Sequence, residues 1–298
     1  MGSELRFLPP ERAPSIDEAM TSCPTEYALR SNDENDVIFL GGSSCRCGID
    51  PKRLAGLRAF NLGSIVGLQP RAILATLRIY LQHHRSPRIV VLCLSPITFD
   101  FATDDVWSTG VTRHFLLNYG ALGGESPPLP ESIEYFIRRG ISGAFTAHAA
   151  DLRDVPLMGQ EGSTYRTFKR DFLAGHGFIP MPGEHGADHH NGPRETVRIG
   201  KEWTPFVRDL SAECRDRGIR LLVLFTPISA EANSARDYSP IDDWCKSLRA
   251  EGVTIDPQRV PEIYPPKLMW DSAHLNAGGV EKFMLTVAQG TCRLLPGK

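Results

Sequence analysis

Short apolar runs alternate with segments of helical periodicity along much of this chain, and this alternation restricts the fold more than any other feature of the sequence. We predict five buried strands, at residues 36–40, 59–62, 88–94, 219–225 and 253–256. We predict helices at residues 70–82, 195–217, 241–250 and 277–294. Because strands that alternate with helices build parallel sheets, the pattern indicates an α/β fold with a doubly wound sheet, in the strand order 2-1-3-4-5.

Two segments depart from the alternation. Residues 1–34 are polar and contain prolines, and we predict an irregular N-terminal arm there. We predict a single α/β domain over residues 35–298, although a chain of 298 residues is also long enough for two domains. Within it, residues 100–192 have only patchy helical periodicity, and we interpret them as an insertion that caps or flanks the sheet.

Composition and charge exclude several classes of protein. Hydrophobic residues make up 41% of the chain and charged residues 23%, which are values of a globular protein. With 33 Lys and Arg against 35 Asp and Glu, the net charge is −2, which argues against a nucleic-acid partner and against binding to anionic lipid. No apolar run approaches the ~18 residues that a membrane span needs. The oligomeric state is not indicated.

The N-terminus and the cysteines bear on location. Residues 1–20 lack the apolar core and the cleavage site of a signal peptide. For the chain as given we expect a soluble, cytoplasmic protein; a leader or anchor removed ahead of the opening Met-Gly-Ser would place it outside the cytoplasm. The seven cysteines are odd in number and scattered, which favours reduced thiols, and Cys45-x-Cys47 lacks the spacing of a zinc or redox motif.

Polar residues follow the first, second and fifth predicted strands, whose carboxyl ends should share one rim of the sheet, where ligands bind in such folds. Ser43 follows two glycines at the end of the first strand; there a serine exposes its hydroxyl and presents its own N–H to an anion. The second loop offers the bare N–H of Gly67. Asp271 and His274 lie just ahead of the last helix.

These residue types suit a serine nucleophile. A serine hydroxyl is a poor nucleophile near pH 7 and needs a base, which His274 can supply, while Asp271 can reach Nδ1 of that ring and fix its tautomer. Simpler interpretations remain: Ser43 as a turn residue, Asp271 as a helix cap and His274 as a surface histidine. Ser44 is the neighbour most easily confused with the nucleophile.

Four motifs together resemble the SGNH (GDSL-like) hydrolase superfamily. They are Ile38–Ser43, Asn61–Gly63, Val90–Leu92 and Asp271-x-x-His274-Leu275-Asn276. The run from Leu40 to Pro51 is most similar to the bacterial branch of that superfamily that acts in polysaccharide and cell-envelope acylation, which includes the alginate O-acetylation proteins and the DltD-like proteins. The similarity covers residues 37–99 and 219–290 and leaves the insertion unmatched.

The resemblance implies a three-layer, flavodoxin-like α/β fold with about five parallel strands. It implies an ester hydrolase or O-acyltransferase that works through an acyl-enzyme, with acetyl or short acyl groups on a carbohydrate as the substrate. Ser43 would be the nucleophile, His274 the base and Asp271 its partner. Gly67 would match the glycine of the oxyanion hole, with Gly63 as the fallback, beside the N–H of Ser43.

The chain departs from the family pattern at two positions. Gly42 stands where the usual motif has aspartate, and residues 94–98 lack the oxyanion-hole asparagine that follows the third strand. Ser95 and Thr98 are the candidates for a third donor. Because the loss of one donor lowers the rate by ~10²–10³, a catalytically silent carbohydrate-binding or assembly protein of the same fold is the alternative function.

A second cluster of polar residues lies in the insertion. His185, Asp188, His189 and His190 are of types that bind zinc. Their loop is rich in glycine and lies off any regular element, so it has no fixed ligand geometry. We predict no metal and no cofactor, and a metal-dependent hydrolase that uses these histidines is a further alternative.

Overall fold

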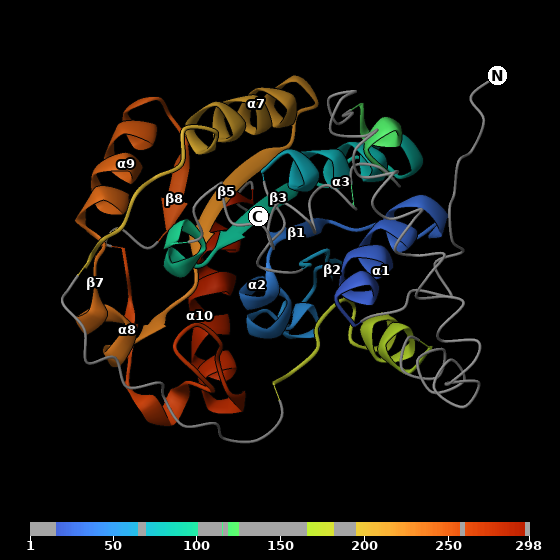
Figure 1. The fold of residues 1–298 in the computed structure, drawn as a ribbon. Coiled ribbons are helices and arrows are strands. Elements are labelled where there is room, and N and C mark those ends of the chain that lie inside the picture. The colour runs from blue at the N-terminus through green and yellow to red at the C-terminus, as the bar shows by residue number, and fades with distance from the viewer. Residues whose placement is uncertain are drawn as a thin grey trace, which may run out of the picture.

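A parallel sheet of five strands organises the protein (Figure 1). The computed structural model describes residues 16–64, 70–100, 115, 119–124, 166–181, 195–256 and 260–295. The strands are β1 (Val37–Gly41), β2 (Ala59–Asn61), β3 (Ile89–Leu94), β5 (Arg220–Phe225) and β8 (Thr254–Asp256). Their order is β2-β1-β3-β5-β8, so the α/β class, the five strands and the order 2-1-3-4-5 are confirmed.

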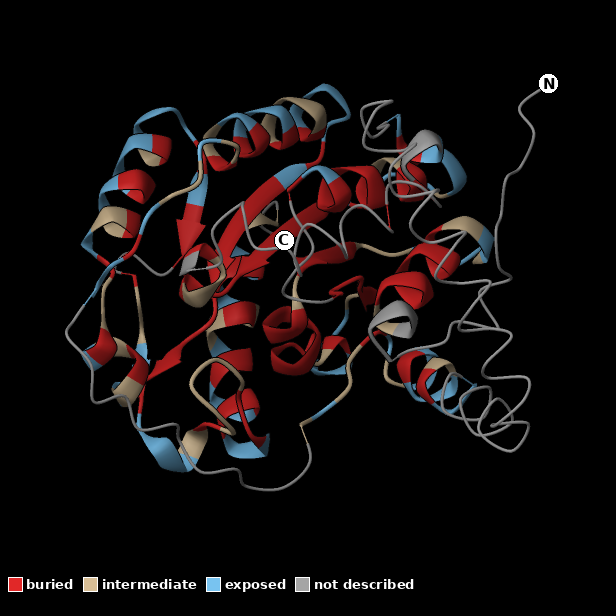
Figure 2. Cartoon of the chain, in the orientation of Figure 1, coloured by how far each residue is buried: buried red, intermediate tan, exposed pale blue. Residues whose placement is uncertain are grey.

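The two central strands are buried on both faces, as their unbroken apolar sequences require. Every residue of β1 and of β3 is buried, and Figure 2 shows the strands almost entirely in the colour of buried residues. β1 pairs with β2 on one side and with β3 on the other, so that Gly41 lies opposite Cys93. The carboxyl ends of β1 and β3 therefore lie level at one rim.

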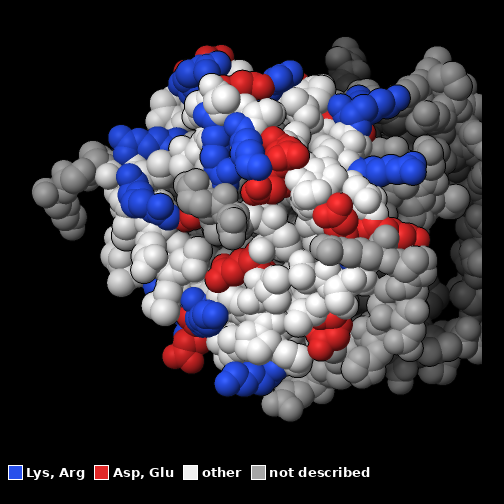
Figure 3. Space-filling model, turned by 90° about the vertical axis from the view of Figure 1, so that its left-hand side faces the viewer, with Lys and Arg blue, Asp and Glu red and all other residues white. Residues whose placement is uncertain are grey.

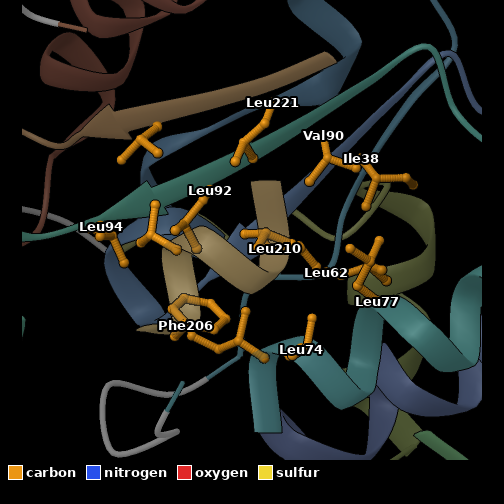
Figure 4. Packing of buried hydrophobic residues seen from close by; sticks show 14 of the residues in the cluster. Ile38, Leu62, Leu74, Leu77, Val90, Leu92, Leu94, Phe206, Leu210 and Leu221 are labelled. Carbon is orange, nitrogen blue, oxygen red and sulfur yellow. The ribbon is translucent and has the colours of Figure 1, made fainter. Parts of the chain in front are cut away.

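Helices cover both faces of the sheet and give three layers. One face carries α1 (Ile16–Arg30), α3 (Pro70–His83), α7 (Trp203–Asp216) and α9 (Ser239–Ala250). Figure 4 shows the packing on this face, where Leu92 and Leu94 of β3 lie near Phe206 and Leu210 of α7. The other face carries α2 (Ser43–Gly48) and α10 (Ala277–Leu294).

The predicted irregular arm is wrong for residues 16–30, which form helix α1. Pro24 lies inside this helix. A proline argues against a helix, because it has no N–H to donate to the carbonyl four residues earlier, and the sequence pattern therefore did not indicate α1. The carbonyl of Met20 instead accepts a hydrogen bond from Ser64 Oγ at 2.9 Å. The ring of Tyr27 stacks on Phe60 at 3.5 Å, which anchors α1 to the sheet.

The predicted helix at 195–217 is also too long at its start. Glu195–Thr196 form β4, which pairs with β7 (Arg236–Asp237), and α7 begins at Trp203. The other three predicted helices are present, and the last of them begins and ends as predicted.

Several short elements complete the described chain. They are α8 (Ala230–Ala235), the pair β6 (Ile228–Ser229) and β9 (Ile263–Tyr264), and the 3-10 turns η2 (Pro51–Arg53), η3 (Pro96–Asp100), η4 (Gly120–Gly123) and η5 (Pro266–Leu268). Most of the predicted insertion at 100–192 lies outside the described residues; residues 166–174, which belong to it, are helical. Within the described part of the chain, no helix combines the length and apolar character of a membrane span.

Candidate active site

The first strand ends in a turn that only glycine fits. Gly41 has a φ of +154°, and a Cβ atom there would lie 2.1 Å from the carbonyl oxygen of Cys93 on β3. Gly42 follows, and α2 begins at Ser43. The chain therefore turns from a buried strand directly into a helix whose first residue is the predicted nucleophile.

Replacing Gly41 with alanine is expected to lower the free energy of unfolding by about 3 kcal/mol or more, because the new methyl group collides with backbone and the φ angle is unfavourable. Gly56 is the matched control: its φ is +75° and open space surrounds it. Gly56→Ala is expected to lower the free energy of unfolding by only about 1 kcal/mol. Urea denaturation measures both; equal losses would contradict the steric argument.

Ser43, His274 and Asp271 are brought together at this rim by contacts between α2 and the segment that precedes α10. Ser43 Oγ lies 2.9 Å from His274 Nε2, and His274 Nδ1 lies 2.7 Å from Asp271 Oδ2. Ser43 is 231 residues away from His274 in the sequence, so the fold creates this contact. The geometry is that of a nucleophile, a base and an orienting carboxylate.

A tight turn holds the acid and the base. Asp271 Oδ1 accepts hydrogen bonds from the N–H groups of Ala273 and His274, both at 2.7 Å. The N–H of Trp270 donates to the carbonyl of His274 at 2.8 Å. The alternative role of Asp271 as the cap of the last helix is wrong, because the side chain of Asn276 caps α10 by accepting from the N–H of Gly279 at 3.0 Å.

The electrostatics of this turn keep the carboxylate charged. Burial raises the pKa of Asp271. A hydrogen bond from the His274 ring, the charge of that ring and hydrogen bonds from two backbone N–H groups lower the pKa by more than burial raises it, so the pKa of Asp271 lies below its ordinary value. Because an ionised carboxylate only accepts, Nδ1 of the ring carries a proton, and in the neutral form of the ring this is the only ring N–H. The lone pair of Nε2 therefore faces Ser43, whose hydroxyl donates to it.

The three side chains are largely buried but keep some exposure. Ser43 is 9% exposed, and the side chains of His274 and Asp271 are 19% and 20% exposed. The ring of Trp270 lies edge-on to the imidazole, with ring centres 6.2 Å apart. Most of the area of these three side chains is therefore shielded from water.

The thiols of α2 do not compete with Ser43 as nucleophiles. Cys45 and Cys47 are buried, and burial raises the pKa of both. A thiol is nucleophilic as the thiolate, and such thiolates are found in exposed, electropositive surroundings. Cys45 instead belongs to the apolar cluster that packs α2 against the sheet.

Of the oxyanion-hole donors, the N–H of Ser43 is well placed at the first position of α2, where helices leave backbone N–H groups without an intrahelical partner. The prediction of Gly63 as the fallback donor is wrong, because its N–H donates to Asn61 Oδ1 at 2.8 Å. The next N–H, of Ser64, donates to the carbonyl of Gly41 at 2.9 Å. Gly67 lies outside the described residues, and its role stays a prediction.

The two candidates for a third donor lie where β3 leads into η3. Ser95 is buried, and its Oγ accepts from the N–H of Ile97 at 3.4 Å. The N–H of Thr98 donates to the carbonyl of Ser95 at 2.9 Å. These bonds close the turn after β3, and no hydrogen bond given for the described residues joins Ser95 or Thr98 to Ser43.

Two residues that support α2 were missed from the sequence. Asn61, fully buried at the end of β2, donates from Nδ2 to the carbonyls of Cys45 and Ile49 at 2.9 and 3.0 Å. Arg46 donates from Nη1 to the carbonyl of Ser64 at 2.5 Å. A polar residue at the end of an apolar strand was the available signal for Asn61; the sequence holds no comparable signal for Arg46.

The predicted metal-binding alternative, residues 185–190, lies outside the described residues. Among the residues that the structure does describe, no group of three or more His, Cys, Asp or Glu side chains is arranged to hold a metal ion. On the face shown in Figure 3, basic and acidic side chains are intermixed. This face therefore carries no continuous basic surface of the kind that binds nucleic acid.

Comparison with known protein families and with curated proteins gives no match for this chain. The functional argument therefore starts from the geometry of Ser43, His274 and Asp271.

Proposed function

We propose that this chain is a serine-dependent esterase or O-acyltransferase of the SGNH type, with Ser43 as the nucleophile. The observation that supports the proposal is the continuous path of hydrogen bonds from Ser43 Oγ through His274 to Asp271, at 2.9 and 2.7 Å. A helix that begins at the serine, after a glycine turn at the end of a central strand, is how a hydroxyl is presented at the rim of an α/β sheet.

In the proposed reaction, Ser43 Oγ attacks the carbonyl carbon of an ester while its proton passes to His274 Nε2. The bond to the leaving alcohol breaks, and the imidazolium returns that proton to the alcohol oxygen. The acyl group then remains on Ser43. Asp271 stays ionised throughout, and its charge stabilises the imidazolium.

The developing oxyanion needs hydrogen-bond donors. We assign the N–H of Ser43 to this role together with the N–H of Gly67. Since Leu62, Gly63 and Ser64 all donate their N–H groups to other acceptors, a donor from the second loop must come from residues 65–69.

The second half of the reaction decides between hydrolase and transferase. His274 takes a proton either from water or from a sugar hydroxyl, which then attacks the acyl carbon and frees Ser43. Acetyl or short acyl groups on a carbohydrate are the proposed substrates, on the basis of the resemblance to the envelope branch of the superfamily.

A fluorophosphonate probe tests the proposal, because it reacts with an activated serine and mimics the tetrahedral intermediate. We expect covalent labelling of the folded protein at pH 7, with the adduct mapped by mass spectrometry to the peptide that contains Ser43. Heat-denatured protein is the control and should not be labelled. Absence of labelling in the folded protein would favour the catalytically silent binding protein, and activity lost on chelation would favour a metal-dependent hydrolase.

Turnover of a simple activated ester is expected to be slow. Residues 94–98 provide no asparagine to the oxyanion hole, and the loss of one donor lowers the rate by ~10²–10³. Binding energy from a natural acceptor can compensate in the transition state. We therefore expect p-nitrophenyl acetate to be cleaved slowly alone and faster with added oligosaccharides; fast cleavage of the bare ester would indicate a complete oxyanion hole.

A further inference from the structure

A buried guanidinium lies one helical turn after the nucleophile. Arg46 is only 4% exposed, and its Nη1 donates to the carbonyl of Ser64 at 2.5 Å. The guanidinium carbon lies 5.8 Å from the centre of the Phe168 ring. Its Nε is enclosed and has no hydrogen-bond partner, and no carboxylate among the described residues forms an ion pair with it.

This arrangement is a poor source of stability. Removing a cation from water is costly, and the described partners of Arg46, which are the carbonyl of Ser64, the thiol of Cys47 and the ring of Phe168, are neutral and compensate only part of that cost. Replacing buried charges by apolar side chains of similar volume is often neutral or stabilising. Within the described part of the chain, stabilisation of the fold therefore does not account for an arginine at this position.

Ser64, whose carbonyl accepts this bond, forms hydrogen bonds with three elements, α2, β1 and α1. Its N–H donates to the carbonyl of Gly41, at the end of β1, at 2.9 Å. Its Oγ donates to the carbonyl of Met20 in α1 at 2.9 Å. Arg46 thus connects the nucleophile helix, through Ser64, to a point that is fixed against both the central strand and α1.

Helix α2 needs such a connection. It has six residues, and its N-cap Gly42 makes no side-chain hydrogen bond, so tertiary contacts must set its orientation. Asn61 holds its carboxyl-terminal half through the carbonyls of Cys45 and Ile49. Arg46 is the side chain that holds α2 to the second loop.

We propose that Arg46 is a positioning residue for the reaction at Ser43. By binding the Ser64 carbonyl, it fixes the direction of α2 and with it the 2.9 Å approach of Ser43 Oγ to His274 Nε2. This inference rests on the proposed function. A misplacement of about 1 Å at a reacting group lowers the rate by about 100-fold, so a small rotation of α2 is enough to impair catalysis.

The test is Arg46→Met, which keeps an unbranched apolar stem and removes the guanidinium group with its charge and donors. Because the contact acts on geometry rather than on binding, we expect kcat for p-nitrophenyl acetate to fall by about 10-fold or more with little change in KM. We expect the thermal midpoint to stay at the wild-type value or to rise. Arg46→Lys, which keeps a cationic donor, is expected to recover part of kcat.

The matched control is Arg208→Met. Arg208 lies exposed on α7 and pairs with Glu251 at 2.6 Å, so its loss should leave kcat and KM unchanged. A kcat within twofold of the wild type in Arg46→Met, a fall in kcat matched by a fall in thermal midpoint, or a failure to fold would each overturn the inference. Absence of serine labelling in the wild-type protein would instead overturn the proposed function, and the role of Arg46 with it.

Discussion

Replacing Ser43 with alanine is expected to abolish fluorophosphonate labelling and to lower kcat for ester cleavage by on the order of 10⁴-fold or more. The variant lacks the oxygen that forms the acyl-enzyme, and water has to attack without covalent catalysis. The described contact of Ser43 Oγ is with His274 Nε2, so the fold should tolerate the loss of one hydroxyl. Thermal midpoints of the wild type and the variant should therefore agree closely.

Ser44→Ala is the control for the Ser43 variant. Ser44 is the next residue of α2 and is also buried, but the serine in contact with the imidazole is Ser43. We expect this variant to keep most of the labelling and turnover. If Ser43→Ala were labelled as strongly as the wild type, the nucleophile would lie elsewhere.

Replacing Asp271 with asparagine is expected to lower kcat by about 10⁴-fold while the fold stays intact. The Oδ1 atom of an asparagine can still accept from the N–H groups of Ala273 and His274, which keeps the turn closed. The amide group would then donate to Nδ1 of the ring, at the place where Oδ2 accepts now. The ring proton would move to Nε2, and Nε2 would no longer be able to take the proton of Ser43.

Asp50→Asn is the matched control for the Asp271 variant. Asp50 Oδ1 also accepts from a backbone N–H two residues later, that of Lys52 at 3.1 Å, at the start of η2. We expect its replacement to leave kcat unchanged. A kcat within tenfold of the wild type in Asp271→Asn, with an unchanged thermal midpoint, would show that the carboxylate does not set the tautomer.

The sheet could be predicted from the sequence because its signals are local. The predicted strand at 88–94 is apolar from residue 89 onward, and β3 occupies this apolar part, Ile89–Leu94. The last helix follows Asn276, a strong capping residue, and its bounds were predicted correctly. Errors arose where contacts between residues distant in sequence determine the local structure. Glu195–Thr196 pair with β7 as a strand, so the predicted helix at 195–217 does not include its first residues.

In the candidate site, too, residues with a local signal could be predicted, and residues whose roles depend on packing could not. Ser43, Asp271 and His274 could be chosen because residue type and spacing indicate their chemistry, and the fold places them in contact. The fallback Gly63 failed because its N–H donates to a side chain, Asn61, whose direction no sequence pattern specifies. Arg46 could not be chosen from the sequence, because its partner, the carbonyl of Ser64, is brought to it only by the packing of α2.

Pro24 has a consequence for where the functional unit begins. By leaving the carbonyl of Met20 without a helical donor, it creates the acceptor that Ser64 Oγ uses, so the first helix contributes to the support of the candidate site. A chain shortened to begin at residue 35 would keep every described strand and the three side chains of the candidate site, yet it would leave Ser64 without this acceptor and uncover the ring of Phe60 on which Tyr27 stacks. The smallest piece of this protein suited to enzymology therefore includes residues 16–30, although none of them contacts Ser43, His274 or Asp271 through a described hydrogen bond.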